Sequence, residues 1–208
     1  MVDVFWWLFV LASLLLILTP GQDMVLVMSR SVAQGPGAGV ATAAGVSIGL
    51  VGHTVLATLG LGAVLRTSEW LFIALKLVGA AYLIYLGACL LLTRASALAL
   101  TDARPRSLPR LFADGAFSNV SNPKIAVFYF AFLPQFVAPG AAHPTLSVFV
   151  LGLVFAALTF LVKGPVGYFA GLLSGWLRAR PAVLTWLHRS SGAILVALGV
   201  KLAFERRD

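Results

Sequence analysis

Three ionisable side chains stand in stretches of the chain that are otherwise apolar. They are Asp23, Lys124 and Lys163. An ionisable group deep in a bilayer costs roughly 2.5–3.5 kcal/mol on insertion scales, so such a residue is seldom without a function. A carboxylate can hold an ammonium group or a transported proton, and a lysine can hold a carboxylate. The three residues therefore suit a small zwitterion. An ion pair of Asp23 with Lys124 or Lys163 is the structural alternative.

Residues that interrupt helices stand beside each of these charges. They are Pro20, Gly21, Pro123, Gly164 and Pro165. A proline inside a helix removes one backbone donor and clashes with the preceding turn, and a glycine lets the chain bend. Backbone groups freed in this way need protein, water or a ligand when the surroundings are lipid. We therefore predict three helix breaks, each next to a charge.

The second break carries the largest set of polar side chains. Asn119 and Asn122 can cap a helix or offer amide groups to a substrate, and Pro123 suits the first position of a new helix. Lys124 would add charge at the positive end of that helix, and together these groups would attract a carboxylate. The structural alternative is a capped re-entry of the chain, with Lys124 extended toward the cytoplasmic surface. For Lys163, carboxylate binding and pairing with Asp23 both stay open.

The composition indicates that lipid is the solvent for most of the chain. Of the 208 residues, 60% are hydrophobic and 11% are charged, whereas soluble domains carry about 25% charged residues. The formal charge of +8 does not indicate nucleic acid, because Lys and Arg lie mostly between the apolar runs. Such residues act as topology signals. We expect one all-α, polytopic transmembrane transporter domain over residues 1–208.

Six stretches are apolar enough to cross the hydrocarbon, which takes about 20 residues in a helix. They are residues 4–28, 38–64, 70–92, 114–137, 145–174 and 184–204. The linker at 93–112 is rich in arginine, so the positive-inside rule predicts that it is cytoplasmic. Both termini are then predicted to be periplasmic or extracellular.

The two halves on either side of this linker resemble each other. A shift that places Pro20 on Pro123 also places Pro36 on Pro139 and Gly49 on Gly152. We therefore predict repeat one at 1–92 and repeat two at 113–208. Because each repeat has an odd number of spans, the two must enter the membrane in opposite directions. Inverted repeats of this kind are common in secondary transporters, which bind substrate near the midplane where helices are broken.

Three segments of the chain resemble the LysE/RhtB family of bacterial amino-acid exporters. They are "TPGQDMVLVMSRSVAQGPGAG" (19–39), "GAFSNVSNPKIAVFYFAFLPQFV" (115–137) and "WLHRSSGAILVALGVKLA" (186–203). The resemblance implies a six-helix inner-membrane carrier that expels amino acids or related metabolites by proton antiport and needs no cofactor. In that family the first motif usually reads Pro-Gly-Pro before Asn or Asp. Here Gln22 replaces the second proline, Asp23 keeps the polar place, and Lys163 departs from the typical pattern.

Other classes of protein fit the sequence less well. A metal-ion exporter of a related fold would need clustered His, Cys, Asp or Glu ligands. A membrane-embedded enzyme would need a catalytic constellation, yet His53, His143 and His188 are scattered and no HExxH or GxSxG motif occurs. We predict neither a metal site nor catalytic residues. The expected partners are an amino-acid substrate, protons and the lipid bilayer, without nucleic acid, and a homodimer is left open.

Overall fold

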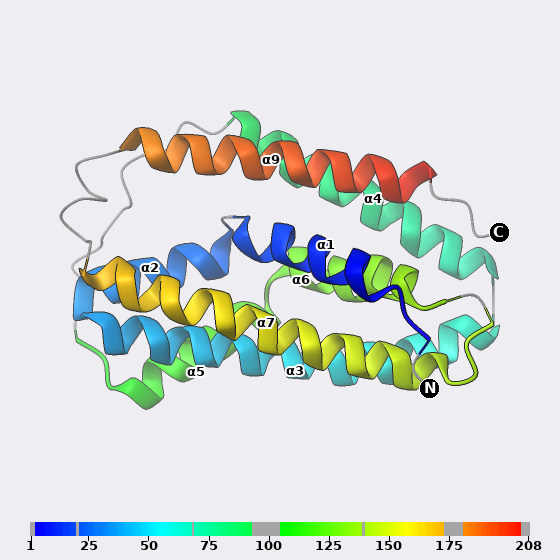
Figure 1. Cartoon of the computed structure of the whole chain (residues 1–208), viewed down its shortest axis with the longest axis horizontal. Coiled ribbons are helices and arrows are strands. Elements are labelled where there is room, and N and C mark those ends of the chain that lie inside the picture. Colours follow the sequence, from blue (N-terminus) through cyan, green and yellow to red (C-terminus); the bar gives the residue numbers. More distant parts are fainter. Residues whose placement is uncertain are drawn as a thin grey trace.

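The computed structural model describes residues 3–19, 21–67, 69–92, 105–138, 140–172 and 181–204 (Figure 1). Over these residues the chain is helical apart from short connections and one isolated bridge between Val4 and Val137. The predicted all-α class is confirmed for this part of the chain. Eight α-helices are described, and a π-helical and a 3-10 segment lie between α6 and α7. The elements are α1 (Trp6–Leu18), α2 (Gln22–Gln34), α3 (Pro36–Thr67), α4 (Glu69–Leu92), α5 (Leu108–Val120), α6 (Pro123–Val127), η1 (Phe128–Phe132), η2 (Leu133–Phe136), α7 (Pro144–Leu172) and α9 (Pro181–Phe204).

Among the described residues, two helical stretches are long and apolar enough to cross a membrane. They are Pro36–Gly60 in α3 and Pro144–Leu172 in α7. The pair α1 and α2 makes a third if it counts as one bent span. Each of the six predicted ranges is occupied by helix. The presence of six membrane spans, rather than these three, stays a prediction.

Two helices are interrupted where proline, glycine and asparagine gather in the sequence. The first interruption separates α1 from α2, whose axes differ by 53°. Gly21 has an extended backbone there, and Pro20 lies outside the described residues. At the second interruption Asn122 accepts a hydrogen bond from the backbone N–H of Lys124 over 3.1 Å. Asn122 is thus the N-cap of α6, and Pro123 opens that helix.

The predicted third break, at Gly164 and Pro165, is wrong. Helix α7 continues through both residues to Leu172. Pro165 has no N–H, so it deprives only the carbonyl four residues earlier of its helical partner. Close packing holds this stretch in place, because Gly167 lies against Gly39 of α3. Tertiary contact of this kind lets a membrane helix keep a proline in its interior.

Small residues let the long helices approach closely. Gly39 lies against Gly167 and Thr54 lies against Gly152, so α3 and α7 run antiparallel. In α4 and α9, Gly87 faces Gly192, and the two helices also run antiparallel, side by side along one edge of the bundle (Figure 1). Contacts between small residues are typical of helix packing in membranes, where no hydrophobic force brings helices together.

The two ends of the bundle differ in what they contain. Helix α1 begins and α9 ends at the same end of the molecule, and the turn from α2 to α3 lies at the other (Figure 1). That other end carries an ionic cluster, in which Arg30, Arg106 and Arg110 surround Asp114. At the end with the termini, the N–H of Phe5 bonds the carbonyl of Phe136 over 3.0 Å. At each end, therefore, polar contacts join segments that are far apart in the sequence.

Candidate functional site

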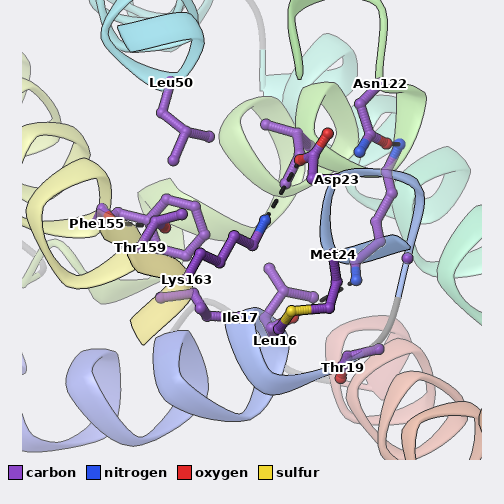
Figure 2. Close-up of a pocket in the computed structure, with 13 residues that line it drawn as sticks. Leu16, Ile17, Thr19, Asp23, Met24, Leu50, Asn122, Phe155, Thr159 and Lys163 are labelled. Atoms are coloured by element: carbon purple, nitrogen blue, oxygen red, sulfur yellow. Dashed lines mark hydrogen bonds and ion pairs between the residues drawn. The ribbon is translucent and has the colours of Figure 1, made fainter. Parts of the chain in front are cut away.

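The two interrupted helices meet at a small internal cavity (Figure 2). Its wall is built from the end of α1, the start of α2, the start of α6, and inward-facing residues of α3 and α7. The free volume is about 10 Å³, which is about the room that one water molecule needs. An amino acid does not fit. The protein is therefore in a closed conformation, with the polar groups of the cavity gathered round a nearly filled centre.

Asp23, in the first turn of α2, is the acidic group of this cavity and is only 2% exposed. Its Oδ2 accepts a hydrogen bond from Nδ2 of Asn119 over 2.8 Å. Lys163 reaches the same oxygen from α7, with its Nζ 3.5 Å away, and Figure 2 shows this side chain extended toward Asp23. Ser118 adds a weaker contact from Oγ to Oδ1 at 3.4 Å. A buried carboxylate is thus compensated by a cation and two neutral donors.

Lys124 enters the cavity from the second interruption. Its Nζ donates to the carbonyl of Leu16, in the last turn of α1, over 3.5 Å. The usual helical donor to that carbonyl would be the N–H of residue 20, which is a proline and has none. A cation near the carboxyl end of a helix is also favoured by the helix dipole. Lys124 therefore satisfies a backbone group that the first interruption frees.

The predicted site residues fall into two groups. Asp23, Asn122, Lys124 and Lys163 line the cavity, as does Gly21. Asn119 stands behind Asp23 and holds it, and its Oδ1 has no partner among the described residues. Asn122 is engaged as the cap of α6. The structure thus brings the three charged residues to one cavity, where Asp23 pairs with Lys163.

Several polar residues of the site escaped the sequence analysis. Ser118 contacts Asp23, and the side-chain amide of Gln22 donates to Ser118 Oγ over 3.2 Å. Gln22 therefore links α2 to α5 at the position where the usual motif has proline. Thr159 lines the cavity one helical turn before Lys163. Its hydroxyl donates to the carbonyl of Phe155, one turn earlier in the helix. Threonines inside apolar helices commonly make this bond, so nothing in the sequence marked Thr159 as part of a site.

His53 lies behind the site and not in it. Its Nε2 is 3.1 Å from the carbonyl oxygen of Asn119, so Nε2 carries a proton and donates. The ring stacks on Tyr129, which is fully buried. The hydroxyl of Tyr129 in turn donates to the carbonyl of Gly152 over 3.2 Å. His53 is thus a packed, hydrogen-bonded residue of α3. Among the described residues no group of three or more His, Cys, Asp or Glu could hold a metal ion.

Comparison with known proteins gives the family. A model of the LysE type translocator family matches residues 14–206. The chain belongs to the LysE-type translocator family. The resemblance seen in the sequence is thus confirmed, and membership identifies a membrane transporter and not an enzyme.

Curated relatives extend over most of this LysE-type chain. The homoserine/homoserine lactone efflux protein of Salmonella typhimurium is 33% identical, over 97% of both chains. The leucine efflux protein of Salmonella choleraesuis is 30% identical, over 74% of both chains. An uncharacterized membrane protein of Pseudomonas aeruginosa is 34% identical, over 95% of this chain and 94% of its own. No solved structure matches.

Proposed function

We propose that this translocator exports amino acids or closely related small metabolites across the bacterial inner membrane, in exchange for protons. The observation that carries the proposal is the cavity between two interrupted helices, which holds one carboxylate and two ammonium groups. Relatives named as homoserine and leucine efflux proteins support the class of cargo.

The charges suggest how a zwitterion would be held. Lys124 has only a long hydrogen bond to a carbonyl oxygen, at 3.5 Å, so it is the group best placed to take the carboxylate of the cargo. Asp23 is the acid of the cavity and would take a proton or, where Lys163 is displaced, the ammonium group of the cargo. Because one carboxylate cannot hold both at full strength, cargo and proton would compete for Asp23. Such competition is one physical basis for exchange.

Transport requires the cavity to open, because its present volume of about 10 Å³ holds no cargo. The antiparallel packing of α3 against α7, and of α4 against α9, supports an arrangement of six spans as two inverted repeats. Helices that such a repeat makes equivalent must run in opposite directions. Rocking of one repeat against the other would then open the cavity toward each end of the bundle in turn.

The orientation that we propose has the arginine-rich end in the cytoplasm. Arg30, Arg106 and Arg110 lie at the end of the bundle opposite the start of α1 and the end of α9. The positive-inside rule assigns that end to the cytoplasm and both termini to the outer side. A homodimer stays a prediction that the contacts of a single chain do not address.

Counterflow in proteoliposomes tests the function. Vesicles with the purified full chain are loaded with one unlabelled amino acid from a panel that includes homoserine and leucine, and uptake of the labelled compound is followed with and without a pH gradient. We expect accumulation of at least one amino acid, and faster flux when protons run against the cargo. The variant Asp23→Asn should lose the effect of the gradient. The matched control Asp3→Asn changes an exposed residue and should keep it. No accumulation of any amino acid would refute the proposal.

A further inference from the structure

Asp23 already has an internal ammonium partner. Lys163 Nζ lies 3.5 Å from Oδ2 of Asp23, and both side chains are at least nine-tenths buried. The same carboxylate receives Asn119 and Ser118, at 2.8 and 3.4 Å. Lys163 therefore already supplies the ammonium group that a cargo would otherwise bring to Asp23. Figure 2 shows Lys163 lying across the cavity, between α7 and Asp23.

The cavity has more basic than acidic side chains in its wall. Among the described residues that line it, the acid is Asp23 and the bases are Lys124 and Lys163. Lys163 balances Asp23, so Lys124 is the charge left over. No ion pair of the described residues involves Lys124, whose Nζ donates to the carbonyl of Leu16 over 3.5 Å. A partly buried ammonium group without an ion-pair partner is costly in a membrane, so this site favours an anion.

We propose that Lys163 takes the place of the ammonium group of the cargo, so that the site accepts small carboxylates that lack an ammonium group, the 2-hydroxy acids, about as well as the matching amino acids. This inference rests on the proposed function and names its substrate class. A 2-hydroxy acid brings one negative charge to Lys124 and leaves the pair of Asp23 and Lys163 intact. Its hydroxyl remains free to hydrogen-bond the polar wall.

A zwitterion gains less from this site than its charges suggest. To reach Asp23, its ammonium group must displace Lys163, which then loses its only acidic neighbour within the described part of the cavity. Breaking one partner out of a buried ion pair is strongly unfavourable. The gain from the new contact is offset by that loss, and the carboxylate held by Lys124 supplies most of the binding. Lys163 therefore acts as a specificity-determining residue.

A matched pair of probes tests this inference. L-leucine and 2-hydroxy-4-methylpentanoate differ only in the replacement of the ammonium group by a hydroxyl. Each is used as the competitor in counterflow of a labelled amino acid that the wild-type protein transports. We expect half-inhibition concentrations within about threefold of each other. In Lys163→Met, Asp23 becomes open to the ammonium group. The half-inhibition concentration of leucine relative to that of the hydroxy acid should then fall by roughly tenfold or more.

Two controls separate specificity from damage to the fold. Lys201→Met makes the same change at an exposed position of α9 and should leave the ratio as in the wild type. Lys163→Gln keeps a polar side chain near Asp23, removes the charge, and should shift the ratio in the same direction as Lys163→Met. If neither Lys163 variant gives a monodisperse protein, the wild-type ratio alone decides.

The outcomes distinguish this inference from the proposed function. A wild-type preference for leucine above about tenfold overturns the inference and leaves amino-acid export standing, and so does a preference that a folded Lys163 variant leaves unchanged. Exchange of 2-hydroxy acids in the same vesicles, with no amino-acid exchange, contradicts the expected parity of the two classes and also refutes export of amino acids. Absence of exchange for every compound refutes both.

Discussion

Asn119 donates a hydrogen bond from Nδ2 to Oδ2 of Asp23 over 2.8 Å. This contact joins the last turn of α5 to the first turn of α2, and so joins the two interruptions of the chain. It is the shortest of the contacts that Asp23 makes to side chains of the described residues. Asn119 therefore fixes where the acid of the cavity stands, although it does not line the cavity itself.

Replacement of Asn119 by alanine should weaken both the fold and transport. A buried carboxylate that loses a donor costs about 1–3 kcal/mol, so we expect a lower melting temperature in detergent and roughly tenfold slower counterflow or worse. The control is Ser118→Ala, because that hydroxyl is 3.4 Å from Asp23 and should matter less. Equal effects of the two substitutions would contradict the assignment of Asn119 as the main support of Asp23.

Close approach of α3 and α5 makes a second, purely steric prediction. A Cβ placed on Gly45 would lie 1.9 Å from the carbonyl oxygen of Phe112, which is backbone and cannot rotate away. We expect Gly45→Ala to cost about 3 kcal/mol or more, because the helices must move apart. The test is the yield of monodisperse protein and its thermal unfolding. Measurement requires only purified protein, without any substrate.

Gly37 is the matched control for this substitution on the same helix. A Cβ there meets nothing within 4 Å, and alanine is favoured over glycine in helices by about 1 kcal/mol. Gly37→Ala should therefore leave stability unchanged or raise it slightly. If Gly45→Ala proved as harmless as Gly37→Ala, the close contact between α3 and α5 would be wrong.

Much of the site could be predicted from local sequence, because lipid leaves few choices. Charges in an apolar run must find one another or a ligand, and the predicted meeting of Asp23 with a lysine follows from that. The start of α6 could also be predicted from the sequence, because an asparagine before a proline is typical of a helix N-terminus. These features depend on residues that are neighbours in the chain, or on a cost that any fold must avoid.

The rest depended on packing between distant segments. Pro165 stays helical because Gly167 is held against α3, and no local sequence pattern predicts that contact. The choice of Lys163 over Lys124 as the partner of Asp23 is set by how α7 faces α2. The π-helical segment Phe128–Phe132 has no breaker within it. Its sequence would suit an ordinary α-helix, so no pattern within it predicted the π-helical geometry.

The ionic cluster at the arginine-rich end makes a third prediction. Asp114 is bound by Arg30 at 3.6 Å and by Arg110 at 3.8 Å, and Arg106 also contacts it. Asp114→Asn leaves three cations without their acid and should cost about 1–2 kcal/mol, since a partly exposed pair contributes about 0.2–1 kcal/mol. Thermal unfolding should show a smaller loss at about 1 M salt, where screening is strong.

Arg110→Gln serves as the control for this cluster. Its side chain is 71% exposed, so its removal should change stability by no more than about 0.5 kcal/mol. A loss for Arg110→Gln as large as that for Asp114→Asn would show that the cluster does not act through its shared carboxylate. An effect of Asp114→Asn that does not depend on salt would argue against an electrostatic origin.

The orientation in the membrane can be tested with single cysteines at the two ends of the bundle. In a Cys89→Ser background we expect His143→Cys, at the end where α1 begins, to react with a membrane-impermeant maleimide in intact cells. Ser107→Cys, at the arginine-rich end, should react only after the membrane is permeabilised. Both native side chains are exposed, and Ser107 makes no capping hydrogen bond to α5, so neither substitution should disturb the fold.

The physical reason for the expected difference in labelling is that arginines are retained on the cytoplasmic side during insertion. Labelling of Ser107→Cys in intact cells, with His143→Cys protected, would reverse the orientation.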